Sequence, residues 1–111
     1  MEITFADRKL VKLANDFKKC QQEMGLNRAR LYNRRLGDLK NALTLEDLRN
    51  LPGHYHELKN DRKGQWACDL DQPYRLVFEP HEDPIPADED GKYIWVQIKG
   101  VEILEIIDYH G

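Results

Sequence analysis

The spacing of apolar residues changes once along this chain, and that change restricts its possible folds more than any other feature. From residue 7 to about residue 43 apolar residues recur every three or four positions, which is typical of helices that bury one face. After Pro52-Gly53 they alternate, in the segments HYHELK, QWACDL and YRLVFE, which is typical of strands. This order predicts an α+β fold, with helices packed on one face of an antiparallel sheet.

The helical part is predicted to be a hairpin of two helices. Asp7 is a candidate cap for the first helix, Gly25 its stop, and Asn27 a candidate cap for the second. The short link makes the helices antiparallel. The predicted apolar stripes are Leu10, Leu13, Ala14, Phe17, Cys20 and Met24 on the first helix, and Tyr32, Leu36, Leu39 and Leu43 on the second. Thr44 and Asp47 resemble a capping box that starts one more helical turn.

The sheet is predicted to contain about four strands. Turn signals at 60–63 and 71–73 separate three of the alternating segments, so these form an antiparallel meander. Its apolar side chains share one face, which suits packing against the helices: Trp66, Cys68, Leu70, Tyr74, Leu76 and Phe78.

The remaining segments complete this arrangement. Residues 2–5 alternate like a short N-terminal strand, and 93–98 and 101–107 are apolar enough for strands, with Gly100 as a bend or bulge between them. Residues 80–92 hold three prolines and a cluster of acids, so we expect a loop insertion that buries little apolar area.

Length and composition exclude several classes of protein. The 111 residues suit a single domain, 1–111, and no apolar run approaches the roughly 20 residues of a membrane span. The N-terminal MEITFADRKL carries charges where a signal peptide needs an apolar core, so a cytoplasmic location is expected. Cys20 and Cys68 have no CxxC spacing and are expected to be buried apolar residues, without a disulfide or a metal.

The net charge of −3 conceals a division along the chain. Residues 1–63 hold 14 Lys and Arg against 9 Asp and Glu, whereas residues 64–111 hold 3 against 11. A basic half can bind phosphate while the acidic half is kept away from it, although a helix with ordinary solvated lysines would count the same way.

Three chemically active side chains are predicted to share one patch on the sheet. If the turn after Lys59 has four residues, His56 stands opposite Ala67, on the same face as Arg75 and away from Trp66. A five-residue loop would reverse that parity. Lys59 ends the strand beside the same face.

The motifs HELKNDRKGQW, YRLVF and a terminal DYH resemble the HigB branch of the RelE/ParE toxin superfamily, whose order of elements also matches. The resemblance implies the toxin of a type II toxin–antitoxin pair, a ribosome-dependent endoribonuclease that cleaves mRNA in the ribosomal A site without a metal or other cofactor. It implies a neutralising partner, an antitoxin with a helix-turn-helix DNA-binding domain like that of HigA. The cleavage residues that it implies are His56, Lys59, Arg75, Asp108, Tyr109 and His110.

The chemistry of RNA cleavage agrees with that set. A 2′-OH must lose its proton, the phosphorane charge must be held, and the leaving 5′-oxygen must gain a proton; imidazole, lysine and guanidinium do this near neutral pH. Asp108 would orient an imidazole or guanidinium, and Tyr109 offers a ring for stacking on a base. The cations expected to contact RNA are Arg28, Arg30, Arg34, Arg35, Arg62 and Lys63.

Other interpretations remain open at this stage. His54 and His56 form an HxH pair that lacks a third metal ligand, and His54 is treated as a bystander. Arg75 can instead pair with Glu57 or Glu79, and the terminal DYH can be a frayed tail. The acidic insertion and the negative net charge depart from the family pattern. A ParE-like gyrase inhibitor and a non-toxic regulatory module are the alternative functions.

Overall fold

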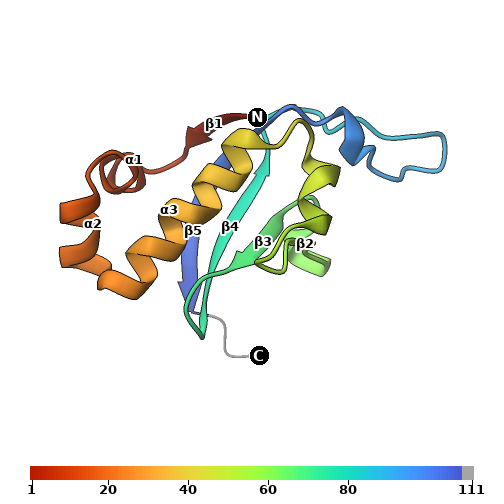
Figure 1. Cartoon of the computed structure of the whole chain (residues 1–111). Helices are drawn as coiled ribbons and strands as arrows, with labels where there is room; N and C mark the ends of the chain where they lie inside the picture. Colours follow the sequence, from red (N-terminus) through yellow and green to blue (C-terminus); the bar gives the residue numbers. More distant parts are fainter. Residues whose placement is uncertain (109–111) are drawn as a thin grey trace.

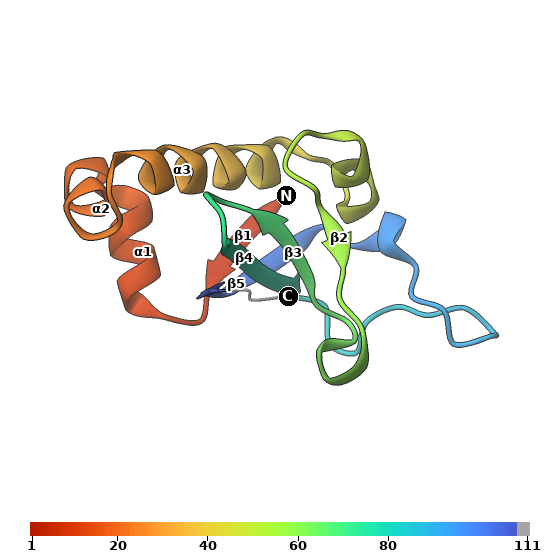
Figure 2. The same ribbon diagram turned by 90° about the horizontal axis from the view of Figure 1, so that it is seen from below.

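The computed structural model of the chain describes residues 1–108, and its elements form two layers (Figure 1). The strands are β1 (Glu2–Phe5), β2 (His56–Glu57), β3 (Trp66–Asp69), β4 (Tyr74–Pro80) and β5 (Gly100–Asp108). The helices are α1 (Arg8–Asn15), α2 (Phe17–Met24) and α3 (Leu26–Asn41), and the 3-10 segments are η1 (Leu45–Asn50), η2 (Asn60–Arg62) and η3 (Trp95–Gln97). Figure 2 shows α3 lying along one face of the sheet, which confirms the predicted α+β arrangement.

The sheet has five strands in the order β1-β5-β4-β3-β2, rather than about four. The prediction of a purely antiparallel sheet is wrong at β1, which pairs parallel to β5 with Glu2 opposite Gly100 and Phe5 opposite Ile103. The predicted meander of β2, β3 and β4 is confirmed as antiparallel. β5 therefore lies between the first strand of the chain and β4.

The first predicted helix is divided into α1 and α2 at Asp16. Asp16 has an extended backbone, and its carboxylate accepts a hydrogen bond from the Lys19 amide as the N-cap of α2. This break leaves Phe17 42% exposed, so the prediction of Phe17 as a core residue is wrong. The helical spacing of apolar residues continues across this break, so it predicted one helix. That spacing gives no information about where a cap interrupts the helix.

The long helix α3 begins at Leu26, with Gly25 rather than the predicted Asn27 as its N-cap. Tyr32, Leu36 and Leu39 are buried as predicted, whereas Leu43 lies beyond the helix and is 81% exposed. The capping box of Thr44 and Asp47 is confirmed at the start of η1.

The core lies between the helices and one face of the sheet. Its largest fully buried side chains include Trp66 and Phe78 from the sheet and Tyr32 from α3, whose hydroxyl donates to the Leu10 carbonyl at 2.9 Å. Cys20 and Cys68 are buried, as predicted, and both are free thiols.

The segment 81–99 does not form the strand predicted at 93–98. Trp95 is instead buried within η3 and packs edge-on against Trp66, with ring centroids 5.5 Å apart. The insertion is also less separate from the core than expected, because its residue Ile85 packs against the core and approaches Gly64.

Gly100 begins β5, and the irregular register of the β4–β5 pair falls between Val77 and Phe78. No helix within residues 1–108 has the length and apolarity needed to cross a membrane.

Candidate active site

The strand register brings His56 and Arg75 to one face of the sheet, away from the helices. His56 pairs with Ala67, Ala67 pairs with Val77, and Val77 stands two residues from Arg75 on β4. Alternation along each strand then puts all four side chains on the same face. The register that assumed a four-residue turn is confirmed.

Lys59 lies in the turn that follows β2. It is the exposed N-cap residue of η2, and the next residue, Asn60, adopts a positive φ of 57° that turns the chain back toward β3. The lysine thus stands two residues beyond the end of β2, and its place beside the face of His56 stays a prediction.

His56 is held in one tautomer by the backbone. Its Nδ1 lies 2.7 Å from the carbonyl oxygen of His54, and a carbonyl can only accept, so Nδ1 carries the hydrogen. In the neutral ring Nε2 then bears the lone pair. This arrangement suits a general base that acts through Nε2.

His54 and Asp69 complete the cluster, although the sequence had not singled out Asp69 and had treated His54 as a bystander. The rings of His54 and His56 stack with centroids 4.2 Å apart. The Asp69 carboxylate lies 3.6 Å from His54 Nδ1 and 3.4 Å from Arg75 Nε. The sequence contained a signal for this partner, because a tight turn at 71–73 places Asp69 directly opposite Arg75, whereas Glu57 and Glu79 were considered instead.

The C-terminal residues of the predicted site are described only in part. In the β4–β5 register Arg75 pairs with Ile107, and Asp108 pairs with Tyr74. Asp108 therefore belongs to the face of the sheet opposite that of Arg75. Tyr109 and His110 lie outside the described residues.

The arginines of α3 divide into two kinds. Arg30 and Arg34 are exposed. Arg28 makes a bidentate ion pair with Asp71, at 2.8 and 3.2 Å, and lies 3.5 Å above the Tyr74 ring; its hydrogen bond with Asp71 is the first cause of its raised pKa. Arg35 is buried, 8% exposed, which does not fit its predicted role as a cation that contacts RNA.

Arg62 crosses the open face of the sheet. One terminal nitrogen donates to Gln65 Oε1 at 2.8 Å, and the other lies 3.3 Å from Glu105, the residue of β5 opposite Val77. This crossing agrees with the complete burial of Ala67 and Val77 on a face without helices. The neighbouring Lys63 is exposed, with its ammonium 5.7 Å from the centre of the Tyr93 ring.

Carboxylates gather at the other end of the open face. A hollow of about 550 Å³ is lined there by Thr4, Glu79, Glu82, Asp83 and Glu102, among others. Burial raises the pKa of Glu79, and the nearby Glu102 and Asp83 raise it further. The face therefore has a basic end at β2–β4 and an acidic end at β4–β5.

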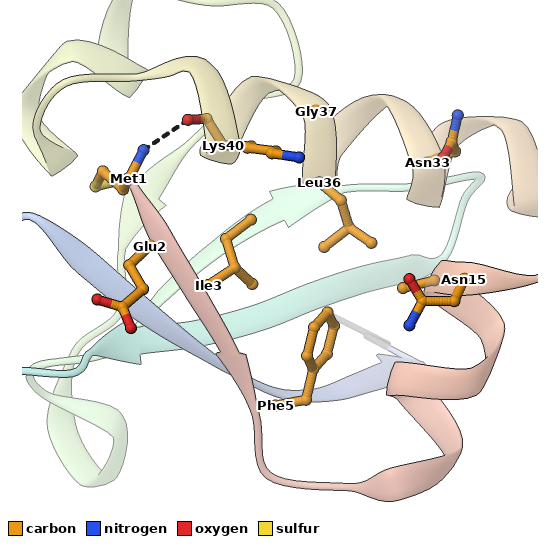
Figure 3. Close-up of a pocket in the computed structure, with 10 residues that line it drawn as sticks. Met1, Glu2, Ile3, Phe5, Asn15, Asn33, Leu36, Gly37 and Lys40 are labelled. Atoms are coloured by element: carbon orange, nitrogen blue, oxygen red, sulfur yellow. Dashed lines mark hydrogen bonds between the residues drawn. The ribbon is translucent and has the colours of Figure 1, made fainter.

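A second hollow, of about 510 Å³, lies on the helix side between β1 and α3. Figure 3 shows Ile3, Phe5 and Leu36 around it, with Lys40 and Asn33 along the helix. Among the described residues, none of those predicted for cleavage lines it. Within residues 1–108, no group of three or more His, Cys, Asp or Glu side chains is placed to hold a metal ion.

No protein-family model and no curated protein matches this sequence. The fold has solved counterparts. A YoeB/ParE toxin from Agrobacterium tumefaciens superposes with a TM-score of 0.60 at 12% identity, covering 99% of this chain and 100% of that one. A YoeB-YefM complex from Staphylococcus aureus gives a TM-score of 0.56 at 16% identity, covering 100% and 98%. The chain therefore has the fold of YoeB/ParE toxins.

Proposed function

We propose that this protein is the toxin of a type II toxin–antitoxin pair and cleaves mRNA on the ribosome without a metal ion. The observation that supports this most directly is the strand register, which puts His56 and Arg75 on one face. Lys59, which follows in the next turn, is proposed to act beside them. The likeness of the fold to YoeB/ParE toxins agrees with it.

The proposed reaction is attack of a ribose 2′-oxygen on the adjacent phosphorus. Nε2 of His56 takes the proton from the 2′-OH, the new O–P bond forms, and the bond from phosphorus to the 5′-oxygen breaks. His110 is the proposed donor of a proton to that leaving oxygen, with Tyr109 in the supporting role implied by the resemblance. Asp108 is proposed to orient an imidazole and not Arg75, because it pairs with Tyr74 and so belongs to the face opposite Arg75. Lys59 and Arg75 stabilise the charge of the phosphorane, which is larger than that of the bound phosphodiester.

The RNA path is proposed to follow the exposed cations Arg30, Arg34 and Lys63, together with Arg62, whose side chain is partly exposed at 38%. Arg28 and Arg35 are excluded from this path, because Arg28 is engaged by Asp71 and Tyr74 and Arg35 is buried. The proposed neutralising partner is an antitoxin with a helix-turn-helix domain, and the proposed location is the cytoplasm. One structural neighbour was solved as a YoeB-YefM complex.

Mapping of mRNA 5′ ends after induced expression tests the proposal. Cuts within translated frames that vanish when translation is blocked support it. Intact mRNA together with relaxed or broken DNA favours the alternative, a ParE-like gyrase inhibitor. Normal growth on free expression, together with purification of the protein alone from its native operon, contradicts both toxin functions.

A further inference from the structure

Asp69 lies between Arg75 and His54 on the open face of the sheet. It is the cross-strand partner of Arg75, and its two carboxylate oxygens face different groups: Oδ1 lies 3.4 Å from Arg75 Nε, and Oδ2 lies 3.6 Å from His54 Nδ1. The side chains of Asp69 and Arg75 are only 25% and 19% exposed, so water screens this ion pair less than one on the surface.

The backbone of Asp69 is fixed from two directions. Its amide donates to the Gly53 carbonyl at 2.8 Å, and its carbonyl accepts from Arg35 Nε at 2.8 Å. Arg35 in turn belongs to the buried face of α3. The carboxylate is therefore placed by the helix layer and by the turn that precedes His54, rather than by its own side-chain contacts.

One oxygen of this carboxylate has no hydrogen bond within the described part of the chain. Asp69 Oδ1 is buried there, and its 3.4 Å contact with Arg75 is an ion pair of ordinary length. A buried acceptor without a hydrogen bond costs stability. Such a cost is typical of functional sites, where a group is held for its effect on a neighbour.

We infer that Asp69 is a positioning residue of the proposed RNA-cleavage site. It orients the Arg75 guanidinium through Nε and holds the His54 ring, which stacks on His56. The flexible arginine is then already arranged when the phosphate arrives, so less conformational freedom is lost in the transition state. This inference rests on the proposed function.

A positioning carboxylate has opposite effects on cleavage and on binding. It helps the transition state by orienting Arg75, and it repels the bound phosphate by its charge. Asp69→Asn keeps the shape and removes the charge. We expect kcat to fall about tenfold to a hundredfold while KM stays the same or falls.

The matched control is Asp71→Asn. Asp71 is also a carboxylate paired with an arginine, it is similarly exposed at 23%, and its contacts with Arg28 are shorter. Its loss should lower stability without lowering kcat. A purely structural role for Asp69 predicts the same behaviour in both variants, with unchanged kcat per folded molecule, and that result overturns the inference.

A second measurement is independent of cleavage. The Nε–H resonance of Arg75, assigned by its absence in Arg75→Lys, should exchange with water more slowly in the unaltered protein than in Asp69→Asn. Equal exchange rates overturn the positioning role even if RNA is cleaved. If the unaltered protein cleaves no RNA, the proposed function fails, and the exchange rates still decide whether Asp69 positions Arg75.

If Asp69→Asn does not fold, Arg75→Lys replaces it in the measurement of kcat and KM. Lysine keeps the charge and lacks Nε–H, so kcat should fall while RNA binding persists. Unaltered kcat in Arg75→Lys shows that orientation through Nε is dispensable and overturns the inference.

Discussion

The guanidinium of Arg35 packs directly against the backbone of Gly53. A Cβ at residue 53 would lie 2.8 Å from Arg35 Cζ, and Gly53 also has a φ of 118°. The turn that carries His54 and leads into β2 therefore depends on a helix residue 18 positions earlier in the chain.

Gly53→Ala should destabilise the protein more than an alanine at another positive-φ glycine. The unfavourable backbone conformation alone costs about 1–2 kcal/mol, and displacement of Arg35 adds to it. Gly91→Ala is the control, because Gly91 has a φ of 80° and a Cβ there would meet nothing within 4 Å. Denaturant unfolding measures both, and equal losses would show that Arg35 yields without cost.

Removal of the proposed catalytic groups should abolish toxicity in a folded protein. Arg75→Gln and Lys59→Gln each remove a charge that stabilises the phosphorane, and each should slow cleavage on the order of a hundredfold. His56→Gln should have at least as large an effect. Lys18→Gln, on exposed α2, is the control for net charge. Growth arrest that persists in all three variants, with the protein folded, contradicts the nuclease proposal.

Glu79→Gln should stabilise the protein at neutral pH. The pKa of Glu79 is raised by burial and by its acidic neighbours, so its ionised form is less favourable in the folded state than in the unfolded state. The penalty applies above the folded-state pKa and disappears as the pH falls to the unfolded value, about 4.3. The gain from Glu79→Gln should therefore shrink across that interval. Glu89→Gln removes an exposed charge of the insertion and serves as the comparison.

The insertion should contain one residue that matters for stability and a tip that does not. Ile85 packs against the core, so Ile85→Ala should cost about 1–2 kcal/mol in the free energy of unfolding. Shortening of the exposed tip, 87–91, should change it little, because loop-closure entropy varies slowly with length. A large loss on shortening the tip would mean that the bridge between Ala87 and Tyr93 supports the core.

Cys68 should be inert in the folded protein. Its burial in β3 raises the pKa of the thiol far above the usual range, and thiolate is the reactive form. Cys20 is also buried, and burial raises its pKa too. Thiol titration at about pH 8 should therefore detect no rapid reaction before denaturation and two thiols after it. Rapid reaction of the native protein would indicate that β3 opens readily.

The sequence correctly predicted those elements that depend on neighbouring residues, such as alternation within a strand or the length of one turn. The alternation around Trp66 and Leu76 was enough for the meander, and the register of His56 followed from one turn length. The break at Asp16 was missed because a single cap interrupts a helical period without changing it. The parallel pairing of β1 was missed because it depends on a partner almost 100 residues away.

The candidate site was only partly accessible from sequence for the same reason. His56 and Arg75 could be placed together by strand alternation. The burial of Arg35 could not be predicted, because an arginine beside an apolar stripe is usually solvated and its partner here is a distant backbone carbonyl, that of Asp69. Asp69 could be identified as the partner of Arg75 only from the residue pairing of β3 with β4.

The position of β5 between β1 and β4 also sets the time at which the sheet can be completed during synthesis. Until residues 100–108 have left the ribosome, β1 has no partner and β4 lacks the strand on one side. Closing a contact between such distant segments is slow, because the entropy of a long loop must be lost first. The proposed active face is thus completed only after nearly all of the described chain has been made. If the proposed function holds, the nascent chain leaves intact the mRNA that encodes it.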